Sequence, residues 1–234
     1  MIINTSSFQN YIKDNIISYV NENTKNIIKI SDTKFNLKGE LVVSDLLLSD
    51  ENLDTILSLK SLSTKFIPLL SANQYESYLN VDGLNLSITD NDRESRQNLR
   101  VNKLNELIGI VYFDKLNLNN SNLIFINDSI EKKVIIDKSS LEDIKSFQDG
   151  IYFNITSFSG NYEDILIDNF QSEINLKNDR ILVDNLNMSS KDQYVKGNLD
   201  IELNENFNFK SSRNSSLEFK INADLLNSLQ KNYK

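Results

Sequence analysis

The spacing of apolar residues changes once along this chain. Between residues 7 and 22, apolar side chains recur every three or four positions, as they do on one face of a helix. Ser7 stands directly before this stripe, and its hydroxyl can accept a hydrogen bond from a free backbone N–H, so we predict a helix with Ser7 as its N-cap. The stripe is wide, which means that the helix must pack against another element. Its members are Phe8, Tyr11, Ile12, Ile16, Tyr19 and Val20.

From Ile27 onward the period is two, which predicts strands with one apolar and one polar face. We expect about a dozen strands, because clusters of Ser, Asn, Asp and Gly separate the alternating runs and favour turns. Short helical turns are expected over residues 66–70, 140–147 and 223–229.

An eight-residue pattern recurs, with apolar residues at its first, third, sixth and eighth positions and a polar step in the middle. Its copies cover residues 41–48, 79–86, 111–118 and 181–188, with partial copies at 153–160 and 165–172. In a straight strand, apolar residues that change parity in this way would point to opposite faces. We therefore predict a bulge, a bend or a reversal at each polar step.

A sheet with one apolar face must cover that face, and a single helix can cover only a few strands. The remaining apolar surface must close on itself as a sandwich or barrel, curl into a groove, or meet a ligand or partner. An ordinary packed core is the simplest of these outcomes.

Composition excludes several classes of function. The 234 residues include no Cys and no His, which removes thiolate nucleophiles, Cys-ligated metal sites and the commonest general base. A net charge of −8 argues against binding to nucleic acid and to anionic membrane surfaces.

Acidic residues offer only weak candidates for chemistry. The segment 90–94 begins like a calcium loop but has Ser95 at the sixth position and Val101 at the twelfth, where Gly and Glu are required. Nothing in the sequence pairs the carboxylates that could serve glycoside chemistry. These are Glu40, Asp45, Asp50, Asp54 and Asp168. We expect no catalytic, cofactor-binding or metal-binding residues.

The order of these features resembles the N-terminal region of the TamB-like proteins of Bacteroidota, within the wider AsmA-like group. The matching segments are 19–23 at the helix end, 27–30, 39–50, 54–62, 81–86 and 189–203. The family normally carries a membrane-anchoring segment before this helix, and its members are far longer. The resemblance therefore implies that the sequence is a fragment of a longer chain.

The family is associated with long β-grooves that bridge the two membranes of Gram-negative bacteria, with phospholipid movement and with outer-membrane protein assembly. The resemblance implies a mainly β fold: an elongated, curled antiparallel sheet, taco-like, over residues 27–234 as one continuous unit, with a capping helix over residues 1–26. It implies a non-enzymatic periplasmic protein without cofactors, anchored in the inner membrane in its full-length form. Its implied partners are phospholipid acyl chains and, through a C-terminal part, an outer-membrane barrel.

The repeated pattern supplies the candidate groove residues. Those before the polar step are Val43, Val81, Phe113, Ile167 and Val183, and those after it are Leu46, Leu84, Leu116 and Leu186. We expect residues of only one parity to line the groove. Two other functions stay open: a scaffold or adhesin-like domain that binds a protein by its sheet edge, and a carbohydrate-active β enzyme.

Overall fold

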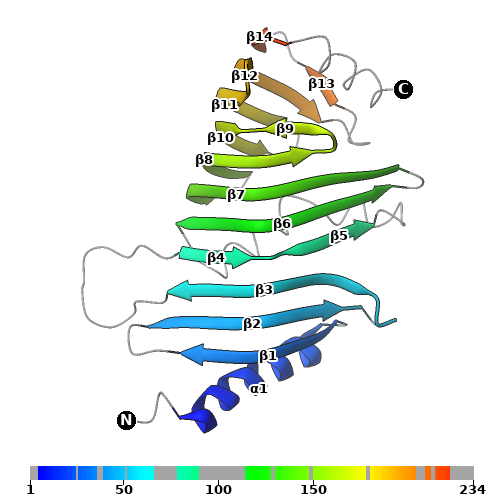
Figure 1. Ribbon diagram of the computed structural model, residues 1–234, viewed down its shortest axis with the longest axis vertical. Coiled ribbons are helices and arrows are strands. Elements are labelled where there is room, and N and C mark those ends of the chain that lie inside the picture. Colours follow the sequence, from blue (N-terminus) through cyan, green and yellow to red (C-terminus); the bar gives the residue numbers. More distant parts are fainter. Residues whose placement is uncertain are drawn as a thin grey trace.

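In the computed structural model, the described residues form one helix and one 14-stranded sheet (Figure 1). The residues that the structure describes are 5–24, 26–35, 39–50, 52–65, 78–89, 114–127, 130–147, 150–177, 180–203, 209–211 and 214–221.

The helix α1 covers Ser6–Asn23. In chain order the strands are β1 (Ile27–Phe35), β2 (Glu40–Ser49), β3 (Thr55–Lys65), β4 (Tyr78–Asp82), β5 (Asn85–Thr89), β6 (Lys115–Asn127), β7 (Ile130–Phe147), β8 (Gly150–Tyr162), β9 (Ile165–Ile167), β10 (Asn169–Lys177), β11 (Arg180–Ser190), β12 (Gln193–Leu203), β13 (Phe209–Ser211) and β14 (Ser216–Lys220).

The strands lie across the sheet in the order β1-β2-β3-β4-β6-β7-β8-β10-β11-β12-β13. Strand β5 lies between β3 and β6, β9 pairs with β8, and β14 pairs with β12. Pairing is antiparallel except that β4 and β5 run parallel to β6, a step that the sequence did not predict. The predicted mainly β fold, a curled sheet with an N-terminal helix, is confirmed.

The helical turn expected over residues 140–147 is wrong, because these residues belong to β7. Leu141 and Ile144 are three positions apart, as on a helix face, but a register shift of β7 against β8 lies between them. A β-bulge therefore imitates a helical spacing here. The turns expected over residues 66–70 and 223–229 lie outside the described residues.

The N-cap of the helix lies two residues earlier than predicted, at Thr5 instead of Ser7. Thr5 has extended backbone angles and its hydroxyl accepts a hydrogen bond from the N–H of Phe8 at 3.3 Å. Ser7, the predicted N-cap, lies inside the first turn. Both residues carry a hydroxyl, and only the backbone geometry distinguishes the one at the cap.

The helix lies along the free edge of β1 and supplies hydrogen-bond partners to that edge. The side-chain amide of Gln9 donates to the carbonyl of Phe35 at 3.0 Å and accepts from the Phe35 N–H at 2.6 Å. The side chain of Asn21 accepts from the N–H of Ile28 at 3.0 Å. An unpaired strand edge invites pairing with other chains, so this helix protects one end of the sheet.

The predicted packing stripe of α1 is only partly right. Ile16 and Val20 pack against the first strands, as does Ile17, which was not predicted. Tyr11 and Tyr19 are 65% and 70% exposed, so their predicted burial is wrong. The helix contacts mainly a single edge strand, which covers a narrower arc of its surface than a broad sheet would.

We predict that Gln9→Ala destabilises the protein by about 1–3 kcal/mol, since it leaves the N–H and C=O of a partly buried edge residue without partners. Urea denaturation gives the free energy of unfolding, and light scattering reports edge-to-edge association. Asn10→Ala, at an exposed neighbouring position, is the control. Equal stability and equal scattering of the two variants would contradict the edge-protecting role of Gln9.

Candidate functional site

The apolar residues of the eight-residue pattern share one face of the sheet. In β2, Val43 and Leu46 are separated by two residues, yet both contribute to the same hydrophobic surface. In β11, Val183 and Leu186 are both buried while the two residues between them are exposed. The apolar residues therefore change parity at the polar step, as predicted. A bend in the backbone at that step returns their side chains to the same face.

The reversal depends on backbone angles that only some residues adopt easily. Asp45, Asn120 and Asn185 have φ of 47°, 48° and 54°, and Gly83 has φ of 66°. These left-handed angles cost about 1–2 kcal/mol for most residues, whereas Gly, Asn and Asp tolerate them. The polar steps thus carry the residue types that the bend requires.

In the first half of the sheet the left-handed residues Asp45, Gly83 and Asn120 lie in one row across the paired strands, without a register shift. We call this row the crease; its other members, which have no left-handed angle, are Ser31, Lys60 and Asp137. A Cβ at Gly83 would lie 2.9 Å from the Cβ of Lys60, so the backbone at Gly83 approaches β3 closely. Because the side chains along the crease are exposed while the apolar residues beside it, such as Leu59, Leu84 and Ile136, are buried, we infer that the sheet bends toward its apolar side.

In the second half of the sheet, single β-bulges take the place of the crease. Register shifts occur on β7 near Asp143, on β8 near Thr156 and on β11 near Asn185. Bulges bend and twist a strand locally. The apolar face thus continues across β8 to β12 by a different backbone device.

Most of the predicted groove residues lie on this face. Val43, Val81 and Val183 are buried, as are Leu84 and Leu186, and Leu46 and Leu116 are half-buried beside them. Ile167 is half-buried and pairs with Gly160. Phe113 lies outside the described residues.

The expectation that only one parity lines the apolar face is wrong. Residues before and after the polar step face the same side, because the left-handed residue restores their orientation. The copy assigned to residues 111–118 is also displaced. In β6 the left-handed residue is Asn120, and the pattern there consists of Leu116, Leu118, Ser121 and Leu123.

Several residues of this face were not among the candidates predicted from the sequence. Leu59 and Leu62 in β3 obey the same spacing, as do Ile30 and Thr33 in β1. Their polar steps hold Lys60-Ser61 and Ser31-Asp32 rather than an acidic residue before Leu. A search for the spacing of apolar positions alone, without the requirement for an acidic residue at the polar step, would have identified these residues.

The buried residues of the apolar face form three hydrophobic clusters. The helix-end cluster is formed by Ile28, Ile30 and Val43, the middle cluster by Leu59, Val81 and Leu84, and the C-terminal cluster by Ile174, Val183 and Leu186. The half-buried residues packed around the middle and C-terminal clusters come from strands that neighbour one another in the sheet. Within the described parts of the chain, no second layer packs over these two clusters, and α1 covers mainly β1.

The opposite face of the sheet is held by hydrogen bonds between polar side chains. Asn117 donates to Asn80 at 2.6 Å and accepts from the hydroxyl of Ser140 at 2.8 Å. Asn80 in turn donates to Ser63 at 3.3 Å. This ladder joins β3, β4, β6 and β7, and its donors and acceptors are used within the sheet.

A second polar network surrounds Tyr152. Its hydroxyl donates to Asn154 at 2.7 Å and to Glu173 at 3.3 Å, and Asn185 donates to Glu173 at 2.6 Å. Partial burial, followed by the negative charge of Glu173, raises the pKa of the Tyr152 hydroxyl above its ordinary value. A tyrosine that holds its proton in this way is a structural donor rather than a base.

The acidic residues considered for glycoside chemistry lie in turns or on strands, and two of them form hydrogen bonds that hold turns. A carboxylate oxygen of Asp50 accepts from the N–H groups of Asn52 and Asp54, both at 2.9 Å, and closes the β2–β3 turn. Asp168 accepts from the N–H of Lys191 at 2.7 Å beside the β11–β12 turn. Asp45 lies on the crease, Glu40 begins β2, and the segment 90–94 lies outside the described residues.

Among the residues that the structure describes, no group of three or more acidic side chains could hold a metal ion. No helix in that part of the chain is long and apolar enough to cross a membrane. In comparisons with known proteins, neither a family model nor a curated protein matches this sequence.

We predict that Asp45→Val destabilises the protein by about 1–2 kcal/mol, because a β-branched residue is strained at positive φ. Asp45→Gly should preserve stability or raise it, since glycine adopts this angle freely. Thermal unfolding of both variants measures the difference. Lys29→Val, at an exposed position of β1, controls for the added apolar surface, and an equally large loss there would contradict the role of the angle.

Proposed function

We propose that the concave apolar face shelters phospholipid acyl chains and that the protein is a non-enzymatic module for lipid transfer or outer-membrane assembly. The proposal places it in the periplasm, anchored in the inner membrane in its full-length form, as the resemblance to TamB-like proteins implies. One observation carries the proposal: the apolar face from β3 to β12 has no covering layer among the described residues.

The dimensions of the face suit acyl chains. From β1 to β12 the sheet order contains nine steps, which at about 4.8 Å each span about 43 Å. One acyl chain occupies half of a hydrocarbon core about 30 Å thick, or about 15 Å. The face is therefore long enough for more than one chain laid across the strands.

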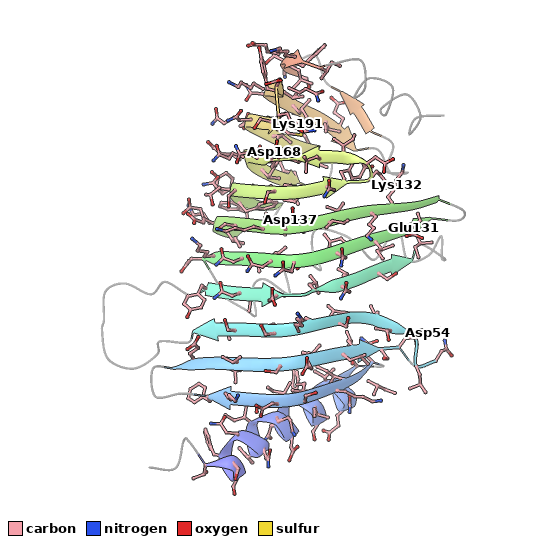
Figure 2. All side chains as sticks on the ribbon, in the orientation of Figure 1. Asp54, Glu131, Lys132, Asp137, Asp168 and Lys191 are labelled. Carbon is pink, nitrogen blue, oxygen red and sulfur yellow. The ribbon has the colours of Figure 1, made fainter. Side chains whose placement is uncertain are left out.

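The chemistry at the strand ends favours an amphiphile. Asp54, Glu131 and Lys132 lie at strand ends on one side of the sheet (Figure 2). A ligand with an apolar tail and a polar headgroup can bury the tail on the apolar face and keep the headgroup in solvent, near these charged residues. Burial of each methylene contributes about 0.8 kcal/mol, so the contact requires no ionic partner.

An ordinary protein core is the main competing explanation of an alternating sheet. A core needs a second layer, which in packed sheets lies about 10 Å away. The side chains around the middle and C-terminal clusters instead belong to adjacent strands of the same layer.

The decisive experiment is native mass spectrometry of the purified protein, with extraction of lipid from vesicles of palmitoyl-oleoyl phosphatidylethanolamine. We expect phospholipid to copurify or to be taken up. Leu199→Asp, on the apolar face of β12, should abolish this binding with an unchanged circular dichroism spectrum, because the open side of the site hydrates the charge. Lys196→Asp, exposed on the same strand, should retain it.

Two results would contradict the lipid proposal. One is the absence of phospholipid both after purification and after incubation with vesicles. The other is a Leu199→Asp variant that folds and binds lipid as well as Lys196→Asp does.

A protein-binding scaffold is the second candidate, favoured by the far end of the sheet. Strand β14 is exposed along its length, and Leu217 and Phe219 are 46% and 61% exposed. Among the described strands only β12 pairs with it. An edge of this kind can accept a strand from a partner.

A further inference from the structure

Strands β13 and β14 pair with successive parts of β12 and end the sheet at the side away from α1 (Figure 1). Every residue of β14 is exposed, and among the described strands only β12 pairs with it. At the opposite edge, the side chain of Gln9 supplies hydrogen-bond partners to the backbone of β1. The outer edge of β14 has no comparable partner in the described parts of the chain, so it can pair with a further strand.

The two exposed apolar side chains of β14 belong to the apolar face. Phe219 pairs with Val195, and Leu217 pairs with Gly197. Val195 packs against the C-terminal cluster, and the two members of a cross-strand pair point to the same face. Leu217 and Phe219 therefore extend the apolar face to its last strand, where they are 46% and 61% exposed.

The same strand carries one acidic and one basic residue, Glu218 and Lys220, on the opposite face. Glu218 pairs with Lys196 of β12, and one of its carboxylate oxygens accepts a hydrogen bond from the hydroxyl of Tyr194 at 2.8 Å. A carboxylate has two oxygens and can accept further hydrogen bonds. The edge therefore presents charges of opposite sign, two positions apart, beside its apolar side chains.

A second copy of β14 matches this edge in one antiparallel register. The apolar faces of both copies lie on the same side only when odd-numbered residues pair with odd-numbered ones, because paired residues share a face. Pairing centred on Glu218 or on Lys220 opposes identical charges, and pairing centred on Leu217 gives neither charge an opposite partner. Pairing centred on Phe219 places Glu218 opposite Lys220 twice, Phe219 opposite Phe219, and Leu217 opposite Ile221.

From this complementarity we infer that β14 pairs with β14 of a second copy of the chain, about a two-fold axis at Phe219. The aromatic rings cover each other, and two ion pairs between Glu218 and Lys220 fix the register. The apolar faces of the two copies then form one continuous surface. A single short strand pair is smaller than a standard stable interface, so we expect a weak dimer. The inference rests on the second candidate function, protein binding by the sheet edge, and does not require lipid binding.

Exchange of the two charges tests the register. In Lys220→Glu the two-fold pairing opposes Glu218 to a second acidic residue, and in Glu218→Lys it opposes Lys220 to a second basic one. A mixture of the two variants restores both ion pairs. Sedimentation equilibrium should therefore give a dissociation constant at least about tenfold lower for the mixture than for either variant alone. Recovery on mixing also shows that both variants are folded.

Disulfide trapping is the second test, since the chain has no Cys of its own. In the inferred register the Cα atoms of the two Phe219 residues are about 5 Å apart, a separation that suits a disulfide. Those of the two Leu217 residues are about 14 Å apart, because four positions along the strand separate them. Under mild oxidation Phe219→Cys should form a covalent dimer, and Leu217→Cys, exposed on the same face, is the matched control that should not.

The outcomes separate this inference from the functions proposed above. Equal dissociation constants for the mixture and for the separate variants would overturn the pairing of charges between copies. Equal crosslinking of Phe219→Cys and Leu217→Cys would overturn the two-fold axis at Phe219. Binding of an extended peptide from another protein, with no self-association, would overturn the second copy as the partner and leave the scaffold function in place. Phospholipid uptake is measured independently with Leu199→Asp.

Discussion

Backbone angles at a few polar positions determine the shape of this sheet. Without the left-handed residues, apolar side chains before and after each polar step would point to opposite faces, and neither face could be buried cleanly. With Asp45, Gly83 and Asn120 in that conformation, β2, the β4–β5 segment and β6 each present the apolar residues of both halves to one side. Because the bends of adjacent strands coincide, they fold the whole sheet along the crease rather than distorting single strands.

The concave face and the protected edge have different structural causes: the first buries apolar side chains, and the second pairs the free backbone groups of β1. The crease brings the apolar side chains of one layer together, so many of them are covered by their neighbours in the absence of a second described layer. The helix addresses the unpaired backbone of β1 instead, chiefly through the side chain of Gln9. It therefore ends the sheet at one side without closing the concave face along its length.

The polar face explains why so many Asn and Ser residues accompany the apolar ones. Ladders such as Asn80–Asn117–Ser140 link strands by side chain as well as by backbone, and one of them spans the parallel step between β4 and β6. Where no facing layer is present among the described residues, hydrogen bonds of this kind stiffen the sheet from its solvent-exposed side. Ion pairs add to these links, as between Lys115 of β6 and Glu142 of β7.

The sequence by itself determined the mainly β character, the N-terminal helix and the need for a bend at the polar steps, because these follow from local periodicity and from the preferences of Asp, Asn and Gly. It also identified seven residues that the structure buries or half-buries on the apolar face, such as Val81, Leu84 and Val183. Only the tertiary structure decided that Thr5 caps the helix, that Tyr11 and Tyr19 stay exposed, and that both parities share one face. These depend on which surface α1 meets and on the alignment of bends between strands, and both are set by pairing between residues distant in the chain. The frame of the pattern in β6, at Asn120, was decided in the same way, since several polar steps of that region fit the spacing and only the register with β4 and β7 selects one.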